Sequence, residues 1–129
     1  MRNAHSRVAE RARRLRFERL VNQVFQGLPD RVRDELDNVG FVVEDEPRGS
    51  HLDGEDGELF GLYVGTPLNE RGGGYTLTVP DVITLFRGPL ERAFPDPGEL
   101  RSQVRITLLH EIAHHLGIDE DDVEELGLA

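Results

Sequence analysis

Apolar positions near the start of the chain recur at the spacing of an α-helix. Residues 1–16 are rich in arginine and hold few apolar side chains. The repeat then runs at i, i+3, i+4, i+7, i+8 and i+11 through Phe17, Leu20, Val21, Val24, Phe25 and Leu28. This pattern predicts a helix with one apolar stripe. A second, shorter amphipathic helix is expected to begin at Pro29 and to end at Gly40.

Short runs of β-branched and aromatic residues mark the centre of the chain. The expected strands cover residues 41–44, 59–64, 75–79 and 82–86. Pro80 separates the last two, because proline cannot donate to a strand ladder. The polar, glycine-bearing stretch 45–58 has the composition of a surface loop, and NERGGG at 69–74 is typical of a hairpin turn.

A short helix is expected in GPLERAF, and the last long helix runs from about Pro97 or Gly98 to Leu116. Helices, then neighbouring short strands, then helices favour a single α+β domain over a doubly wound parallel sheet. We expect a short mixed or antiparallel sheet packed against the last long helix. Residues 29–129 would form this domain, and residues 1–28 would be an arginine-rich helix that is part of it or appended to it.

The composition narrows the classes of protein and of site. The 129 residues are 37% hydrophobic and 31% charged, and no apolar run approaches the roughly 20 residues that cross a bilayer. We therefore expect a soluble, cytoplasmic protein with no membrane partner. The chain has no cysteine, so a metal ion would need His, Asp or Glu as ligands. The net charge of −10 makes a nucleic-acid partner unlikely on sequence grounds, although arginines gather near the start and acids near the end.

The strongest chemical signal lies in HEIAHH, residues 110–115, on the last long helix. Residues four apart on a helix share a face, so His110 and His114 can both aim an imidazole nitrogen at one ion. Glu111 falls beside them, about 100° from His110 and about 60° from His114, where it can reach a metal-held water as a general base. Spacing alone therefore predicts a metal site with an adjacent base.

A zinc hydrolase usually takes three protein ligands and a water. Gly117 directly follows the last apolar position and can take the left-handed conformation of a helix C-cap, which turns the chain back toward the histidines. The acids beyond it, Asp119, Glu120 and Asp121, are the candidates for a third ligand. The acidic run from 119 to 125 can equally be the charged first turn of a last helix.

The segment HEIAHHLGIDE resembles the HExxHxxGxx(H/D) signature of zincins. LFGLYVGTPLNER and PDVITLFRGPLER, taken with it, are similar to segments of a small bacterial minimal zincin-like metallopeptidase family, over about residues 29–128. The resemblance implies a minimal zincin-like fold, a Zn²⁺ cofactor and a peptide or protein substrate. It also implies Glu120 as the third ligand, although the family pattern has Asp there, which leaves Asp119 and Asp121 as alternatives.

Other polar residues receive structural interpretations. His115 lies about 140° around the helix from His110, which favours a place in the core or behind the ligands. Tyr63, Tyr75 and Arg87 can polarise a carbonyl, yet each is typical of packing or surface positions in a sheet. Two functions follow as hypotheses: a zinc peptidase, or a catalytically silent zincin-like module that binds a metal or a protein. The sequence makes no prediction of oligomeric state.

Overall fold

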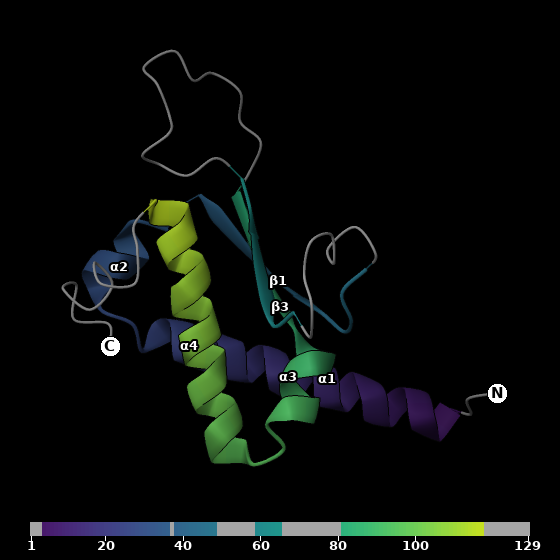
Figure 1. Ribbon diagram of the computed structural model, residues 1–129. Coiled ribbons are helices and arrows are strands. Elements are labelled where there is room, and N and C mark those ends of the chain that lie inside the picture. Colours follow the sequence, from purple (N-terminus) through teal and green to yellow (C-terminus); the bar gives the residue numbers. More distant parts are fainter. Residues whose placement is uncertain (1–3, 37, 49–58, 66–80, 118–129) are drawn as a thin grey trace.

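A computed structural model describes residues 4–36, 38–48, 59–65 and 81–117 of the protein (Figure 1). The elements in chain order are α1 (Ala4–Gln26), α2 (Asp30–Asp34), β1 (Val39–Glu44), β2 (Gly61–Val64), β3 (Asp81–Phe86), α3 (Arg87–Ala93) and α4 (Pro97–Leu116). Among the helices of these ranges, none has the length and apolar character that crossing a membrane requires.

The three described strands form one mixed sheet in the order β1-β3-β2. β1 runs parallel to β3 with Phe41 opposite Ile83, and β2 runs antiparallel to β3 with Tyr63 opposite the same residue. The strands predicted at 41–44, 59–64 and 82–86 correspond to β1, β2 and β3, whereas the one at 75–79 lies outside the described residues. A small mixed sheet with helices confirms the predicted α+β class.

The helices pack on one face of this sheet and enclose the core. Alternate strand residues Val43, Ile83 and Leu85 point into it, because successive side chains of a strand face opposite sides. The helical members are Phe17, Val21 and Val24 of α1, Leu90 of α3, and Val104, Leu108, Leu109 and Ile112 of α4, with Leu28, Val32 and Leu36 between α1 and β1. Val42 and Val64 on the other face are 42% and 53% exposed, so the sheet is covered mainly from the helical side.

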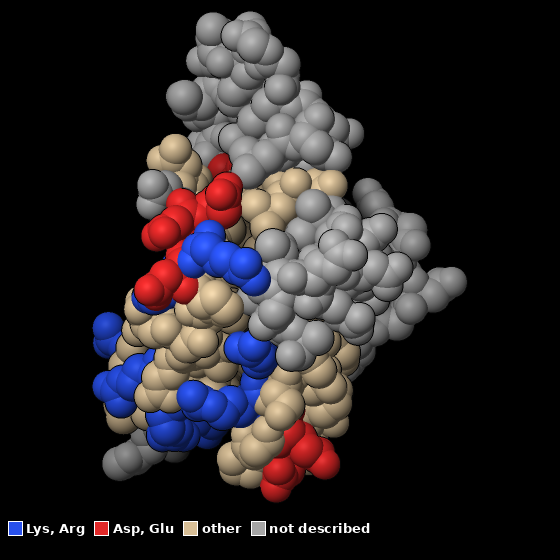
Figure 2. Space-filling model, turned by 90° about the vertical axis from the view of Figure 1, so that its left-hand side faces the viewer, with Lys and Arg blue, Asp and Glu red and all other residues tan. Residues whose placement is uncertain are grey.

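α1 extends far beyond the apolar stripe and includes most of the arginine-rich start. Alanine, arginine and glutamate have high helix propensities, which explains a helix through a segment with little to bury. Arg7, Arg11, Arg13, Arg16 and Arg19 are exposed. Figure 2 shows a face on which basic side chains gather in the lower left, below a group of acidic ones.

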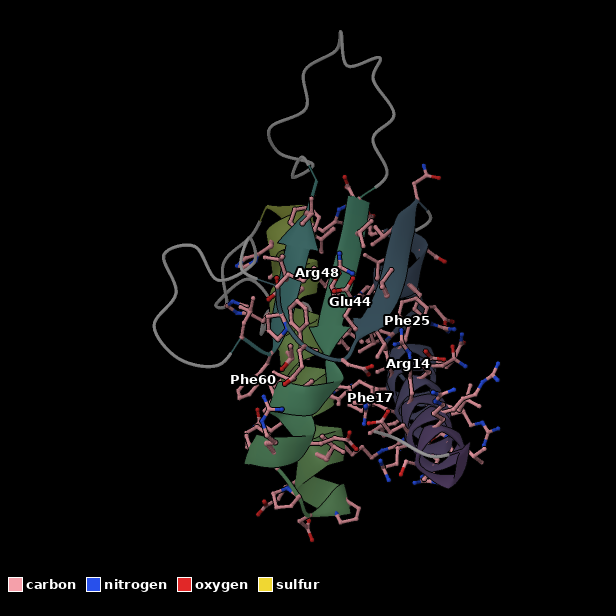
Figure 3. The ribbon with its side chains drawn as sticks, turned by 90° about the vertical axis from the view of Figure 1, so that its right-hand side faces the viewer. Arg14, Phe17, Phe25, Glu44, Arg48 and Phe60 are labelled. Carbon is pink, nitrogen blue, oxygen red and sulfur yellow. The ribbon has the colours of Figure 1, made fainter. Side chains whose placement is uncertain are left out.

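Arg14 is the arginine of α1 that reaches the sheet. Its Nη2 donates to the carbonyl oxygen of Val43 over 2.6 Å, and its Nη1 lies 3.4 Å from Asp45 Oδ2 (Figure 3). On the same side, the rings of Phe25 and Phe41 lie 4.8 Å apart between their centroids. These contacts tie α1 to β1.

The second helix differs from the sequence prediction. Pro29 is the N-cap residue of α2 and lies just outside it, and the helix ends at Asp34. Gly40, predicted to end this helix, lies inside β1 opposite Val82. Leu36 is already buried in the core, and Val39 begins the pairing with β3, so strand hydrogen bonds replace the continuation of the helix. The prediction of a helix up to Gly40 was therefore wrong.

Arg87 fastens the start of α3 to the end of β1. Its Nε donates to Asp45 Oδ1 over 2.9 Å and its Nη1 to Glu91 Oε1 over 2.6 Å. Burial lowers the pKa of Arg87, but the hydrogen bonds and charges of these two carboxylates outweigh burial and raise the pKa above its ordinary value. The side chain serves as a structural link between two acids.

Two glycines that directly follow a helix give a matched test of the end of α4. Gly117 has φ +72°, whereas Gly27, which follows α1, has no positive φ. We expect Gly117→Ala to lower the free energy of unfolding by about 1–2 kcal/mol, because an L side chain is strained there. Gly27→Ala should change it by less than about 0.5 kcal/mol. Urea unfolding of the metal-free variants, followed by circular dichroism, measures both, and equal losses would contradict the left-handed cap.

Candidate metal centre

α4 carries the predicted metal-binding residues, and both of its ends are built by local sequence. Asp96 is the N-cap, and its Oδ2 accepts from the backbone N–H of Glu99 over 3.0 Å. Pro97 opens the first turn, where its missing N–H costs nothing. Gly117 caps the other end in the left-handed conformation. The bounds predicted for this helix and its glycine cap are confirmed.

The two sides of α4 have different environments. The side toward the sheet and α1 is buried and includes Val104, Thr107, Leu108, Glu111, Ile112 and His115. His110 and His114 are exposed, as is Ile106, which is 55% exposed one turn before His110. The core fixes the rotation of the helix, so the two histidines have to face outward at the edge of the packed side.

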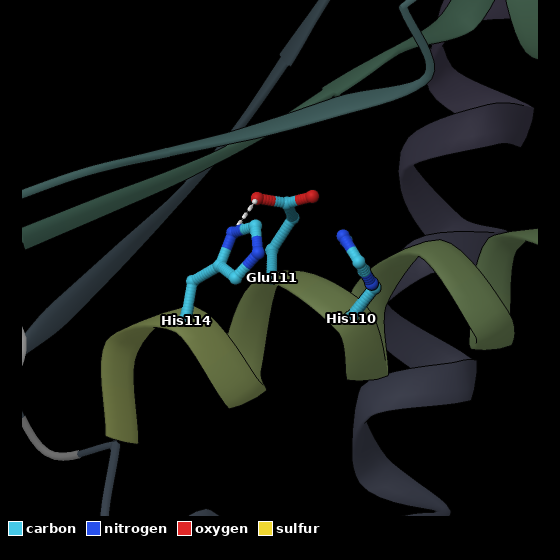
Figure 4. A group of neighbouring side chains, drawn as sticks. All are labelled: His110, Glu111 and His114. Carbon is cyan, nitrogen blue, oxygen red and sulfur yellow. Dashed lines mark hydrogen bonds and ion pairs between the residues drawn. The ribbon is translucent and has the colours of Figure 1, made fainter. Parts of the chain in front are cut away.

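His110, Glu111 and His114 meet on one turn of α4 (Figure 4). One possible ligand atom from each lies within 4.8 Å of the other two. The two imidazole rings are 4.5 Å apart between centroids, at an angle of 65°. Glu111 Oε1 lies 3.1 Å from His114 Nδ1. An ionised carboxylate can only accept, so this contact is a hydrogen bond in the tautomer that carries the hydrogen on Nδ1, and that tautomer leaves the Nε2 lone pair for a metal.

The donor set fits a zinc ion. Imidazole nitrogens and carboxylate oxygens are zinc ligands, and two nitrogens at about 2.0–2.1 Å from a tetrahedral ion are about 3.4 Å apart. The separation of up to 4.8 Å between the possible ligand atoms exceeds this by up to about 1.4 Å. Rotation of exposed side chains closes such a gap, and the side chain of His114 is 51% exposed.

Whereas His110 and His114 are exposed, Glu111 is buried. Its side chain is 7% exposed, although it belongs to the same turn as the exposed histidines. It lies between α4 and β2, and a β-carbon at Gly61 would come within 3.3 Å of Glu111 Cγ. The sheet therefore holds the stem of this side chain, while its carboxylate reaches His114.

His115 faces the interior, as its angular position on the helix predicted. It is 3% exposed, and its Nδ1 lies 2.7 Å from Oδ2 of Asp81, which is also 3% exposed. The distance is that of a hydrogen bond, but the ring is not aligned as a donor toward this oxygen. The two groups therefore form a close polar contact and not a hydrogen bond. The ring of Tyr63 meets His115 edge-on at 5.6 Å. This cluster joins β3, β2 and the end of α4.

The remaining candidates divide into two groups. Tyr63 packs on His115, and Arg87 binds Asp45 and Glu91, which agrees with the packing roles expected for both. Glu120, with the alternatives Asp119 and Asp121, lies outside the described residues, as does Tyr75. The sequence reasoning did not find Asp81 or Gly61, because each meets α4 only through the folding of the sheet.

Comparison with known families agrees with this geometry. The profile of the zincin-like metallopeptidase family matches residues 36–128. The chain therefore belongs to this family, and membership implies a metal ion, usually zinc. Among curated proteins, none matches the chain at a significant level.

His115 is buried and His110 is exposed, so replacing each by alanine tests how α4 packs against the sheet. We expect His115→Ala to lower the free energy of unfolding of the metal-free protein by about 2–4 kcal/mol, because it leaves Asp81 buried without this polar neighbour. His110→Ala, at an exposed position, should change it by less than about 0.5 kcal/mol. Urea unfolding in the presence of a chelator measures both, and a larger loss for His110→Ala would contradict this arrangement.

Proposed function

We propose that the protein is a zinc-dependent peptidase, in which His110, His114 and Glu120 hold Zn²⁺ and Glu111 is the general base. The observation that carries the proposal is the turn of α4 on which two exposed imidazoles flank a buried glutamate. Family membership supports the reaction class. The choice of Glu120 rests on its offset from His114 in the zincin motif, and the choice of a peptide substrate rests on the family.

The protein's own residues have distinct tasks in this proposal. A bound zinc ion supplies a water of lowered pKa, about 7, and polarises the scissile carbonyl. The Glu111 carboxylate takes the proton of the attacking water and returns it to the leaving amine. The contact between Glu111 Oε1 and His114 Nδ1 helps to keep that imidazole in the tautomer that offers Nε2. Burial of the glutamate stem limits the rotamers through which its carboxylate can move.

β2 is the element that suits an extended substrate. It is an outer strand of the described sheet, it runs antiparallel to β3, and it packs against α4 beside Glu111. A peptide that pairs with an outer strand gains main-chain hydrogen bonds without dependence on its side chains. Such pairing would bring a scissile bond alongside the metal centre.

A second function has one observation in its favour. In the part of the chain that the structure describes, His110 and His114 are exposed, whereas a binding cleft encloses most of its ligand. The alternative is a catalytically silent module that binds a metal, or binds a protein at this exposed surface. The peptidase and the metal-binding form of the module both require the metal centre, and only the peptidase requires Glu111 to move a proton.

Replacement of Glu111 by glutamine distinguishes the peptidase from the catalytically silent module. We expect Glu111→Gln to retain zinc and to lower kcat/KM for peptide cleavage by about 100-fold or more, because the amide cannot accept the proton. Metal analysis of protein purified without added zinc, followed by cleavage of a peptide library, makes the measurement. Zinc without cleavage in the wild type would favour the binding module, and absence of zinc affinity would refute both the peptidase and the metal-binding module.

The third ligand has its own test. We expect Glu120→Ala to weaken zinc binding by about tenfold or more, because removal of a ligand opens a coordination position. Asp119→Ala and Asp121→Ala should each change it by less than about threefold. Competition with a chromogenic chelator measures the three dissociation constants. A larger loss for either aspartate would assign the ligand to that residue.

A further inference from the structure

Gly61, the first residue of β2 and a buried one, lies close against α4. A β-carbon added there would lie 2.7 Å from Thr107 Cγ2 and 3.3 Å from both Glu111 Cγ and Leu85 Cδ2. Ordinary van der Waals contact begins at about 3.4 Å. Thr107, which is itself buried, would have to shift by roughly 0.7 Å among close-packed side chains.

The α4 residues nearest to Gly61 are Thr107 and Glu111. Thr107 and Glu111 are four residues apart, so they lie on the same face of α4 and turn that face toward β2. The absence of a side chain at residue 61 therefore sets how near the strand comes to the stem of Glu111. His110 and His114 are exposed, so this contact constrains Glu111 more directly than it does the two histidines.

Gly40, another strand glycine, has no such contact. A β-carbon at Gly40 of β1 would meet nothing closer than 3.8 Å, which is ordinary contact. Neither Gly40 nor Gly61 has a positive φ, so backbone conformation explains neither glycine. Residue 61 has to be glycine because the side chains of Thr107, Glu111 and Leu85 occupy the space that a β-carbon would need.

We propose that Gly61 is a positioning residue for the general base: the close approach that it permits between β2 and α4 holds the Glu111 carboxylate at His114 and at the metal centre. The catalytic meaning of this placement rests on the proposed peptidase function. The placement itself is a property of the metal-free protein and can be measured without turnover.

Three variants test the proposal. Gly61→Ala adds the crowding methyl group, and Thr107→Ser in the same chain removes the threonine methyl group that lies nearest to it. Gly40→Ala is the control for a methyl group in a strand. We expect Gly61→Ala to lower kcat by about 10- to 100-fold, because displacement of a catalytic group by about 1 Å is costly. KM and the zinc dissociation constant should stay within about threefold of the wild type, since the histidines keep their places.

The double variant should regain at least about tenfold of a 100-fold loss in kcat, with the remainder due to the 3.3 Å contacts. Gly40→Ala should match the wild type. Unchanged KM and zinc affinity in Gly61→Ala separate positioning from a general loss of fold, which would weaken both, and rescue at Thr107 identifies the contact that is responsible. A Gly61→Ala enzyme with wild-type kcat would overturn the proposal, as would a loss that Thr107→Ser leaves unchanged or that Gly40→Ala reproduces.

A second measurement needs no substrate. Ring nitrogen NMR shifts of His114 in the metal-free protein report which nitrogen carries the hydrogen, and we expect Nδ1 in the wild type because of its contact with Glu111. Gly61→Ala should move the shifts toward the Nε2 tautomer, and the double variant should return them. If the wild type cleaves no peptide, the peptidase function fails, and these shifts still decide the placement: unchanged shifts in Gly61→Ala overturn it.

Discussion

The packing of α4 across β2 and β3 governs where the candidate site residues lie. Leu108 and Ile112 bury on the helix side that meets Ile83 and Leu85 of the sheet, and this contact sets the rotation of the helix about its axis. Burial of a large aliphatic side chain contributes about 1.5–3 kcal/mol, so a rotation that exposed this row would be strongly disfavoured. The exposed positions of His110 and His114 follow from the burial of their neighbours.

Residues 110–115 of α4 therefore provide three environments for polar groups. His110 and His114 are in contact with solvent, Glu111 is held in the seam between helix and strand, and His115 is enclosed beside Asp81. A metal needs ligands that it can reach from solvent, whereas a base of fixed position needs a confined stem. The edge of a packed face is the place on a helix where both conditions hold within four residues.

Local features of the chain could be predicted from its sequence. The bounds of α4, its glycine cap, the shared face of His110 and His114 and the inward direction of His115 all depend on helix geometry over a few residues. The early end of α2 was missed, because pairing of Val39 with Asp81 outweighs the helical pattern. For the same reason, the contacts of Gly61 and Asp81 with α4 could not be predicted from the sequence. Their contacts with α4 join segments that are distant in sequence, and periodicity carries no information about them.

The parallel pairing of β1 with β3 bears on the order in which the site can assemble. Residues 45–80 separate these strands in the chain, and joining them requires closure of a long loop, which slows folding. The spacing of His110 and His114 needs only one formed turn of α4, so a partly folded chain can already bind a metal through that pair. Any such binding lessens the stabilisation that the metal gives to the native state. The surroundings that position Glu111 form only with the sheet, so metal binding would precede the positioning of Glu111 during folding.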